Sequence, residues 1–189
     1  LQDVSVKTEG SFSHALDVTD GGSITAVSAD LTTAQDHSSA IATDRGGGDI
    51  QVAGGTARTE GGLSAVIYST GMIDVCGLTG SSALAEAIVV EGANSVQASS
   101  SDLTGGTHGA YMYSSTPGGS GGGTLTLSGG TLTAQNGNAV FVDGVSATIN
   151  LSNAAKLDPG SGNVLSVTNN GSASASLTET ELEGQLTAD

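Results

Sequence analysis

The sequence predicts an all-β fold, a right-handed parallel β-helix (solenoid) of about seven to eight coils of roughly 25 residues, with three short strands in each coil. The first observation behind this prediction is a short apolar phrase that returns at a nearly fixed interval. The second is an alternating strand that follows each phrase. The third is that glycine-rich corners, and no helical stretches, join these segments.

The opening strand of each coil is expected where a small residue precedes a large apolar residue, any residue and another apolar residue. The first example is Ala15-Leu16-Asp17-Val18, and successive examples begin about 25 residues apart, the interval of a repeat array. The seven phrases occupy residues 15–18, 40–43, 65–68, 87–90, 110–113, 139–142 and 164–167. In each phrase we expect the second and fourth residues to point into the core and the third to point to solvent.

A second strand follows each turn, and its alternating polar and apolar residues are typical of a half-buried strand. These strands are expected at 23–26, 49–52, 72–75, 95–98, 124–127 and 146–149. A third, weaker strand is expected at 30–33, 56–59, 102–105 and 131–134. Together they predict one elongated domain, residues 1–189, that is a segment of a longer protein, with residues 114–123 as a Gly-rich loop insertion.

The charge of the chain restricts its partners. The formal net charge is −15, and the only lysines and arginines are Lys7, Arg45, Arg58 and Lys156. This balance disfavours nucleic acid and anionic membrane surfaces as partners. No apolar run approaches the roughly 20 residues of a membrane span, so we expect no membrane insertion of this segment.

An apolar stripe is expected along one outer face of the solenoid. The third positions of the middle phrases are Ile67, Val89, Met112 and Phe141, which are large apolar residues where a purely solvated rod needs none. The stripe predicts either a docking surface, for a partner or another copy of the chain, or a face covered by a neighbouring segment. The three tyrosines of these phrases, Tyr68, Tyr111 and Tyr113, are compatible with a sugar-stacking patch. They occupy second or fourth positions, however, so we favour a role in filling the core.

Acidic residues gather near the turns that follow the first two phrases. Asp17, Asp20, Asp44 and Asp49 would repel one another on adjacent coils unless a hard cation such as calcium bridged them. Asp-Gly is also the ordinary composition of a tight turn. The sequence therefore leaves two interpretations open, a calcium site formed by these four residues or no cofactor at all.

The chain resembles the right-handed β-helical passenger and adhesin domains of bacterial surface proteins, including autotransporter-like ones. The resemblance rests on residues 125–142, which read LTLSGGTLTAQNGNAVFV, and on the closing TELEG at 180–184. It implies export to the bacterial cell surface or beyond. It also implies a noncatalytic adhesive or stalk role, with a protein or glycan on a host or neighbouring cell surface as the partner.

Pectate-lyase-like enzymes and calcium-dependent polysaccharide-binding modules share the same coil plan and form the competing classes. A lyase would need clustered carboxylates around calcium with a basic residue above one sheet. The only acid at an outward strand centre of the second sheet is Asp74, and Arg45 and Arg58 belong to other positions of the coil. We therefore expect no catalytic residues. A calcium-dependent polysaccharide-binding module is the first alternative, and a polysaccharide lyase the second.

Overall fold

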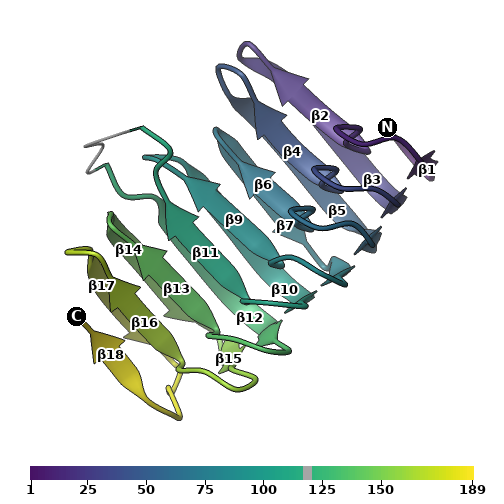
Figure 1. The fold of residues 1–189 in the computed structure, drawn as a ribbon. Helices are drawn as coiled ribbons and strands as arrows, with labels where there is room; N and C mark the ends of the chain where they lie inside the picture. The colour runs from purple at the N-terminus through teal and green to yellow at the C-terminus, as the bar shows by residue number, and fades with distance from the viewer. Residues whose placement is uncertain (117–120) are drawn as a thin grey trace.

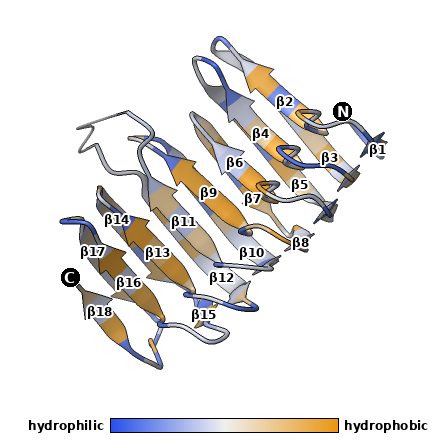
Figure 2. Cartoon of the chain, viewed as in Figure 1, coloured by the Kyte–Doolittle hydropathy of each residue, from blue (hydrophilic) through white to orange (hydrophobic). Residues whose placement is uncertain are grey.

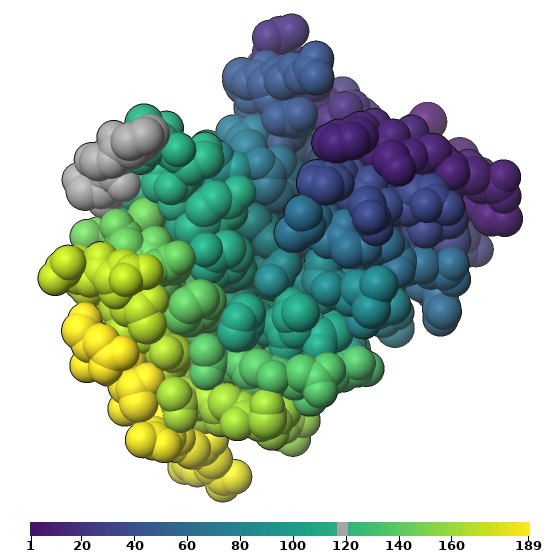
Figure 3. Space-filling model, in the orientation of Figure 1, coloured from purple at the N-terminus to yellow at the C-terminus, as the bar shows by residue number. Residues whose placement is uncertain are grey.

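A computed structural model, which describes residues 1–116 and 121–189, is a parallel β-solenoid of about seven coils of roughly 25 residues (Figure 1). The described residues form strands, turns and bends, and no helix. The coils follow one another in chain order, as the successive bands of colour in Figure 3 show. The predicted all-β parallel solenoid is confirmed.

The strands form two sheets in which all neighbouring strands are parallel. Sheet A contains β1 (Ser5–Thr8), β3 (Gly22–Thr33), β5 (Gly48–Thr59), β7 (Met72–Cys76), β8 (Thr79–Ser82), β10 (Ser95–Gly105), β12 (Thr124–Ala134), β14 (Ser146–Ser152), β15 (Lys156–Asp158) and β17 (Ser172–Thr178). Sheet B contains β2 (Leu16–Thr19), β4 (Ile41–Asp44), β6 (Ile67–Ser69), β9 (Ile88–Glu91), β11 (Ala110–Tyr113), β13 (Val140–Asp143), β16 (Leu165–Thr168) and β18 (Leu186–Ala188).

The prediction of three short strands per coil is wrong for several coils, because the second and third strands merge. In β3, β5, β10 and β12 a single long strand covers both. The strand bends at a residue with positive φ, such as Ser28 in β3 or Ser100 in β10, and the pairing resumes directly after it. Only where the pairing lapses at the bend do two strands remain, as β7 and β8 or β14 and β15.

The core lies between the two sheets and is filled by one apolar column from each inward strand position (Figure 2). In sheet A, Ile50 pairs with Ile73 and Ile73 with Val96. In sheet B, Ile41 pairs with Ile67 and Ile67 with Ile88. Each of these residues is at most 1% exposed, so stacking makes a continuous core from a few apolar residues per coil.

The predicted loop insertion at residues 114–123 joins β11 to β12. Residues 114–116 and 121–123 lie outside any strand. Residues 117–120 of this predicted loop lie outside the described residues. Within residues 1–116 and 121–189, no helix has the length and apolar character to cross a membrane.

Candidate functional site

The outer face of sheet B carries a column of aromatic and apolar side chains. Strand pairing places Tyr68 beside Val89, Val89 beside Tyr111, and Tyr111 beside Phe141. All four therefore occupy equivalent outward-facing positions on consecutive coils. The tyrosine and phenylalanine side chains are half-buried, and Val89 is almost covered by its neighbours.

This register corrects the stripe predicted from the sequence. Val89 and Phe141 face outward as expected, but Ile67 and Met112 are wholly buried in the core at 0% exposure. Their places in the outward column belong to Tyr68 and Tyr111, which were predicted to point inward. A slip of one residue moves a whole strand to the opposite face, and the alanine used to align the phrases is displaced by one residue in these two coils.

Glu91, at the end of β9, accepts hydrogen bonds from hydroxyl groups on both sides of its strand. Its Oε2 atom accepts a hydrogen bond from Tyr113 Oη at 3.0 Å and another from Tyr68 Oη, and its Oε1 atom accepts one from Ser115. Burial alone would raise the pKa of Glu91, but hydrogen bonds from Ser115, Tyr68 and Tyr113 outweigh it and lower the pKa. Glu91 is therefore an ionised carboxylate at neutral pH that holds two tyrosine rings in place.

The remaining aromatic rings are fixed by stacking and by Asp143. Tyr111 stacks on Tyr113 with ring centroids 4.8 Å apart, and on Phe141 at 5.4 Å. Tyr111 Oη donates to Asp143 Oδ2 at 3.0 Å. Burial raises the pKa of Tyr113 to about 12, and it also raises the pKa of Tyr68 and of Tyr111. The tyrosine hydroxyls therefore remain neutral donors.

A ridge of exposed apolar side chains borders this face at the corner that precedes sheet B. Phe12, His37 and Leu63 occupy equivalent corner positions, each with φ between 54° and 56°. Phe12 is 74% exposed and Leu63 69% exposed, and the Phe12 ring stacks on His37 with centroids 4.6 Å apart. Bulky residues seldom adopt a left-handed conformation and seldom face solvent together. The ridge is therefore a feature that neither packing nor turn formation explains.

Buried serines hold the ridge in place. Ser64 Oγ accepts the Ser38 backbone N–H at 2.9 Å and donates to the Gln35 carbonyl at 2.9 Å. Ser38 Oγ donates in the same way to the Gly10 carbonyl at 3.0 Å. These hydrogen bonds connect the corner of each coil to the corner of the next, and so hold the residues of the ridge in place.

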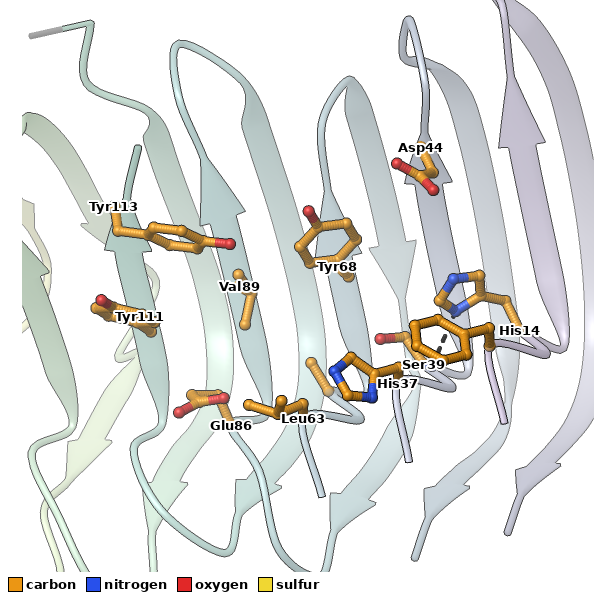
Figure 4. Close-up of a pocket in the computed structure, with 12 residues that line it drawn as sticks. His14, His37, Ser39, Asp44, Leu63, Tyr68, Glu86, Val89, Tyr111 and Tyr113 are labelled. Carbon is orange, nitrogen blue, oxygen red and sulfur yellow. Dashed lines mark hydrogen bonds between the residues drawn. The ribbon is translucent and has the colours of Figure 1, made fainter. Parts of the chain in front are cut away.

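A pocket of about 370 Å³ lies between the ridge and the aromatic column (Figure 4). One side is formed by the ridge with His14 and Ser39, whose backbone N–H donates to His14 Nδ1 at 2.9 Å. The other side is formed by the tyrosines, and two carboxylates, Asp44 and Glu86, also line the pocket. Glu91 lies directly behind this wall, where it accepts hydrogen bonds from Tyr68 and Tyr113. Figure 4 shows the ring of Tyr68 on one side of Val89 and the rings of Tyr111 and Tyr113 on the other, on strands of sheet B that flank β9. The site is a shallow hollow with aromatic faces and acidic hydrogen-bond acceptors.

The structure does not bring the four aspartates predicted as a calcium site into one cluster, although the backbone N–H of Asp20 donates to the carbonyl of Arg45, the residue after Asp44, at 3.1 Å. Asp17 is exposed on sheet B opposite Ala42, whereas Asp49 is exposed on sheet A opposite Ser23. The Asp44 carboxylate lies 3.8 Å from Arg45 Nε. In the described part of the chain, no three His, Cys, Asp or Glu side chains are grouped so as to hold a metal ion. Calcium binding by these four aspartates therefore stays a prediction, and no step below involves a metal ion.

Sequence reasoning assigned the tyrosines to the core and missed the ridge and Glu86. A signal near Tyr113 exists in the sequence, because Glu91, with which it pairs, directly precedes the turn glycine Gly92. The ridge had no comparable signal, since its positive φ is visible only in the structure. Comparisons of the chain with protein-family models, with curated proteins and with solved structures return no match.

Proposed function

We propose that this chain is a noncatalytic binding segment of an extracellular surface protein and that it engages carbohydrate through the outer face of sheet B. The observation that carries the proposal is the juxtaposition of three tyrosine rings with fixed carboxylates in a preformed hollow. Aromatic rings stack against the apolar faces of sugars, and carboxylates accept hydrogen bonds from sugar hydroxyls. Both features repeat along the solenoid, as a chain-like ligand requires.

The spacing of the rings supports a polymeric ligand. Tyr68 and Tyr111 are two coils apart, which corresponds to about 10 Å at the usual distance between paired strands. That span is comparable with a disaccharide in an extended chain. A polysaccharide aligned with the axis of the solenoid would therefore meet Tyr68, then Tyr111 two coils later and Phe141 on the coil after that.

The state of the carboxylates supports binding without turnover. A glycosidase needs a carboxylic acid whose pKa is raised, so that it can donate a proton. Glu91 has a lowered pKa and its oxygens accept three hydroxyl groups, while Asp44 is paired with Arg45. Neither residue is placed to serve as a proton donor.

A glycan array probed with the wild-type chain and with a Tyr68→Ala, Tyr111→Ala double variant tests the proposal. We expect carbohydrate binding that weakens about tenfold or more in the variant, as for the loss of central aromatic contacts. Gln97→Ala, on the exposed outer face of sheet A, is the matched control and should bind normally. Circular dichroism must show that all variants are folded.

Three outcomes would contradict the proposal. Binding to no glycan would refute carbohydrate as the ligand class. Equal binding by the wild-type chain and the double variant would refute the outer face of sheet B as the binding surface. Release of reducing or unsaturated sugar from a bound polysaccharide would refute the noncatalytic role. Loss of binding in EDTA would instead favour the calcium-dependent polysaccharide-binding module.

A further inference from the structure

The pocket between the ridge and the tyrosines is lined by two carboxylates and by no lysine or arginine; its only basic side chains are the imidazoles of His14 and His37. It is lined by Asp44 and Glu86, and Glu91 lies directly against two of its rings. Each lysine and arginine of the chain pairs with a carboxylate two residues or fewer away: Lys7 with Glu9, Arg45 with Asp44, Arg58 with Glu60, and Lys156 with Asp158. Only the Arg45 pair touches the pocket, and the Arg45 side chain is 85% exposed.

Glu86 differs from Asp44, which pairs with Arg45, and from Glu91, whose oxygens accept three hydroxyl groups. The Oε1 atom of Glu86 accepts one hydrogen bond, from Thr107 Oγ1 at 3.0 Å. No lysine or arginine pairs with Glu86. It is half-buried beside the aromatic column, where screening by solvent is reduced. This side chain is therefore available to a charged ligand group.

We propose, on the basis of the proposed carbohydrate-binding function, that this pocket selects sugars that carry a protonated amino group. Ammonium groups are attracted both to the faces of aromatic rings and to carboxylates, and the pocket places Tyr68 and Tyr111 together with Glu86. Polyuronates and sulfated sugars are disfavoured by the same charges and by the net charge of −15. The ligand class is thus an amino-sugar polymer with free amines.

Calorimetry with defined oligosaccharides tests this selectivity. The probes are a glucosamine hexasaccharide, its fully N-acetylated counterpart and an oligogalacturonate, at a pH where the sugar amine is protonated. We expect the free-amine oligomer to bind about five- to tenfold more tightly than the acetylated one. This is the gain expected when one ammonium group forms an ion pair with a carboxylate and a cation–π contact near the protein surface. Added salt should reduce this preference.

A matched pair of variants assigns the effect to the pocket. Glu86→Gln keeps the acceptor for Thr107 and removes the charge, so the preference for the free amine should be lost while binding of the acetylated oligomer persists. Glu183→Gln, an exposed position in the last coil, removes the same charge elsewhere and should leave the preference unchanged. Binding of a pentalysine peptide is measured as well, to test whether the pocket recognises an amino sugar or any chain of positive charges.

The outcomes distinguish the two proposals. Equal binding of both glucosamine oligomers, with no effect of Glu86→Gln, would overturn the amino-sugar inference and leave the carbohydrate proposal standing. Tighter binding of the oligogalacturonate or of pentalysine would overturn it as well. Failure of all the oligosaccharides to bind, on a glycan array as well as in solution, would overturn both.

Discussion

Truncation of Ile67 tests the register of the solenoid directly. Ile67 is 0% exposed, so Ile67→Ala removes three buried carbon atoms from the core. At about 0.8 kcal/mol for each buried methylene, the loss of transfer free energy is about 2.4 kcal/mol. The cavity left between the tightly paired coils raises the expected destabilisation to about 3 kcal/mol.

Urea unfolding followed by far-ultraviolet circular dichroism measures this change. With a slope of about 2 kcal/mol per molar urea, the midpoint should fall by about 1.5 M. Leu63→Ala is the matched control, because it also truncates an aliphatic side chain but at 69% exposure. Its unfolding free energy should stay within about 0.5 kcal/mol of the wild-type value.

An Ile67→Ala variant as stable as Leu63→Ala would refute the register. In that case Ile67 would face solvent, Tyr68 would face the core, and the aromatic column would not exist. Both proposals about ligands would then lose their structural basis. The stability measurement therefore serves as a prior check on every binding experiment described above.

Two further predictions concern a corner glycine pair and a histidine. Gly54 and Gly55 both have positive φ, but an added Cβ would meet nothing within 4 Å at Gly54 and a backbone oxygen at 2.1 Å at Gly55. In urea unfolding, Gly54→Ala should therefore lower the free energy of unfolding by about 1 kcal/mol and Gly55→Ala by several times more. Equal losses for the two variants would contradict the close approach of neighbouring coils at Gly55. His108 Nδ1 accepts the Asn138 backbone N–H at 3.0 Å, and burial lowers the pKa of His108. Its contribution to stability should thus be complete above the ordinary histidine pKa and decline as the pH falls below it, because the unfolded chain takes up the proton first. His108→Asn, which copies the acceptor found at Asn138 one coil later, should flatten this decline in thermal unfolding, and an unchanged pH profile would assign it to other groups.

The architecture of the chain could be predicted because it depends on features that every coil shares. The inward positions of sheet A and sheet B are apolar in nearly every turn, so the period survives irregularities in single coils. Fusion of the second and third strands could not be predicted, since it depends on whether the backbone bends within the ladder. Ser28 and Ser100 adopt the left-handed conformation, which cannot be predicted from the residue type.

The candidate site could not be predicted in the same way because it is formed where the repeat is irregular. Alignment on the small leading residue works for β4 and β9, where Ala40 and Ala87 precede the inward isoleucine. In β11 the alanine itself, Ala110, takes the inward position that Ile88 holds in the coil before. The following residue then faces outward, and that residue is a tyrosine.

Local chemistry explains why these irregular coils are stable. A tyrosine hydroxyl in the apolar core would lack a partner, at a cost of about 1 to 3 kcal/mol, whereas on the outer face Tyr68 and Tyr113 both reach Glu91 and Tyr111 reaches Asp143. Ala110 leaves space in the core that the fully buried Met112 can help to fill from the next inward position. The acidic residues at the ends of sheet B strands thus act as anchors for outward rings. Because the same residues set both the register and the chemistry of the pocket, a change that restored the regular phrase would be expected to remove the aromatic face while leaving the solenoid intact.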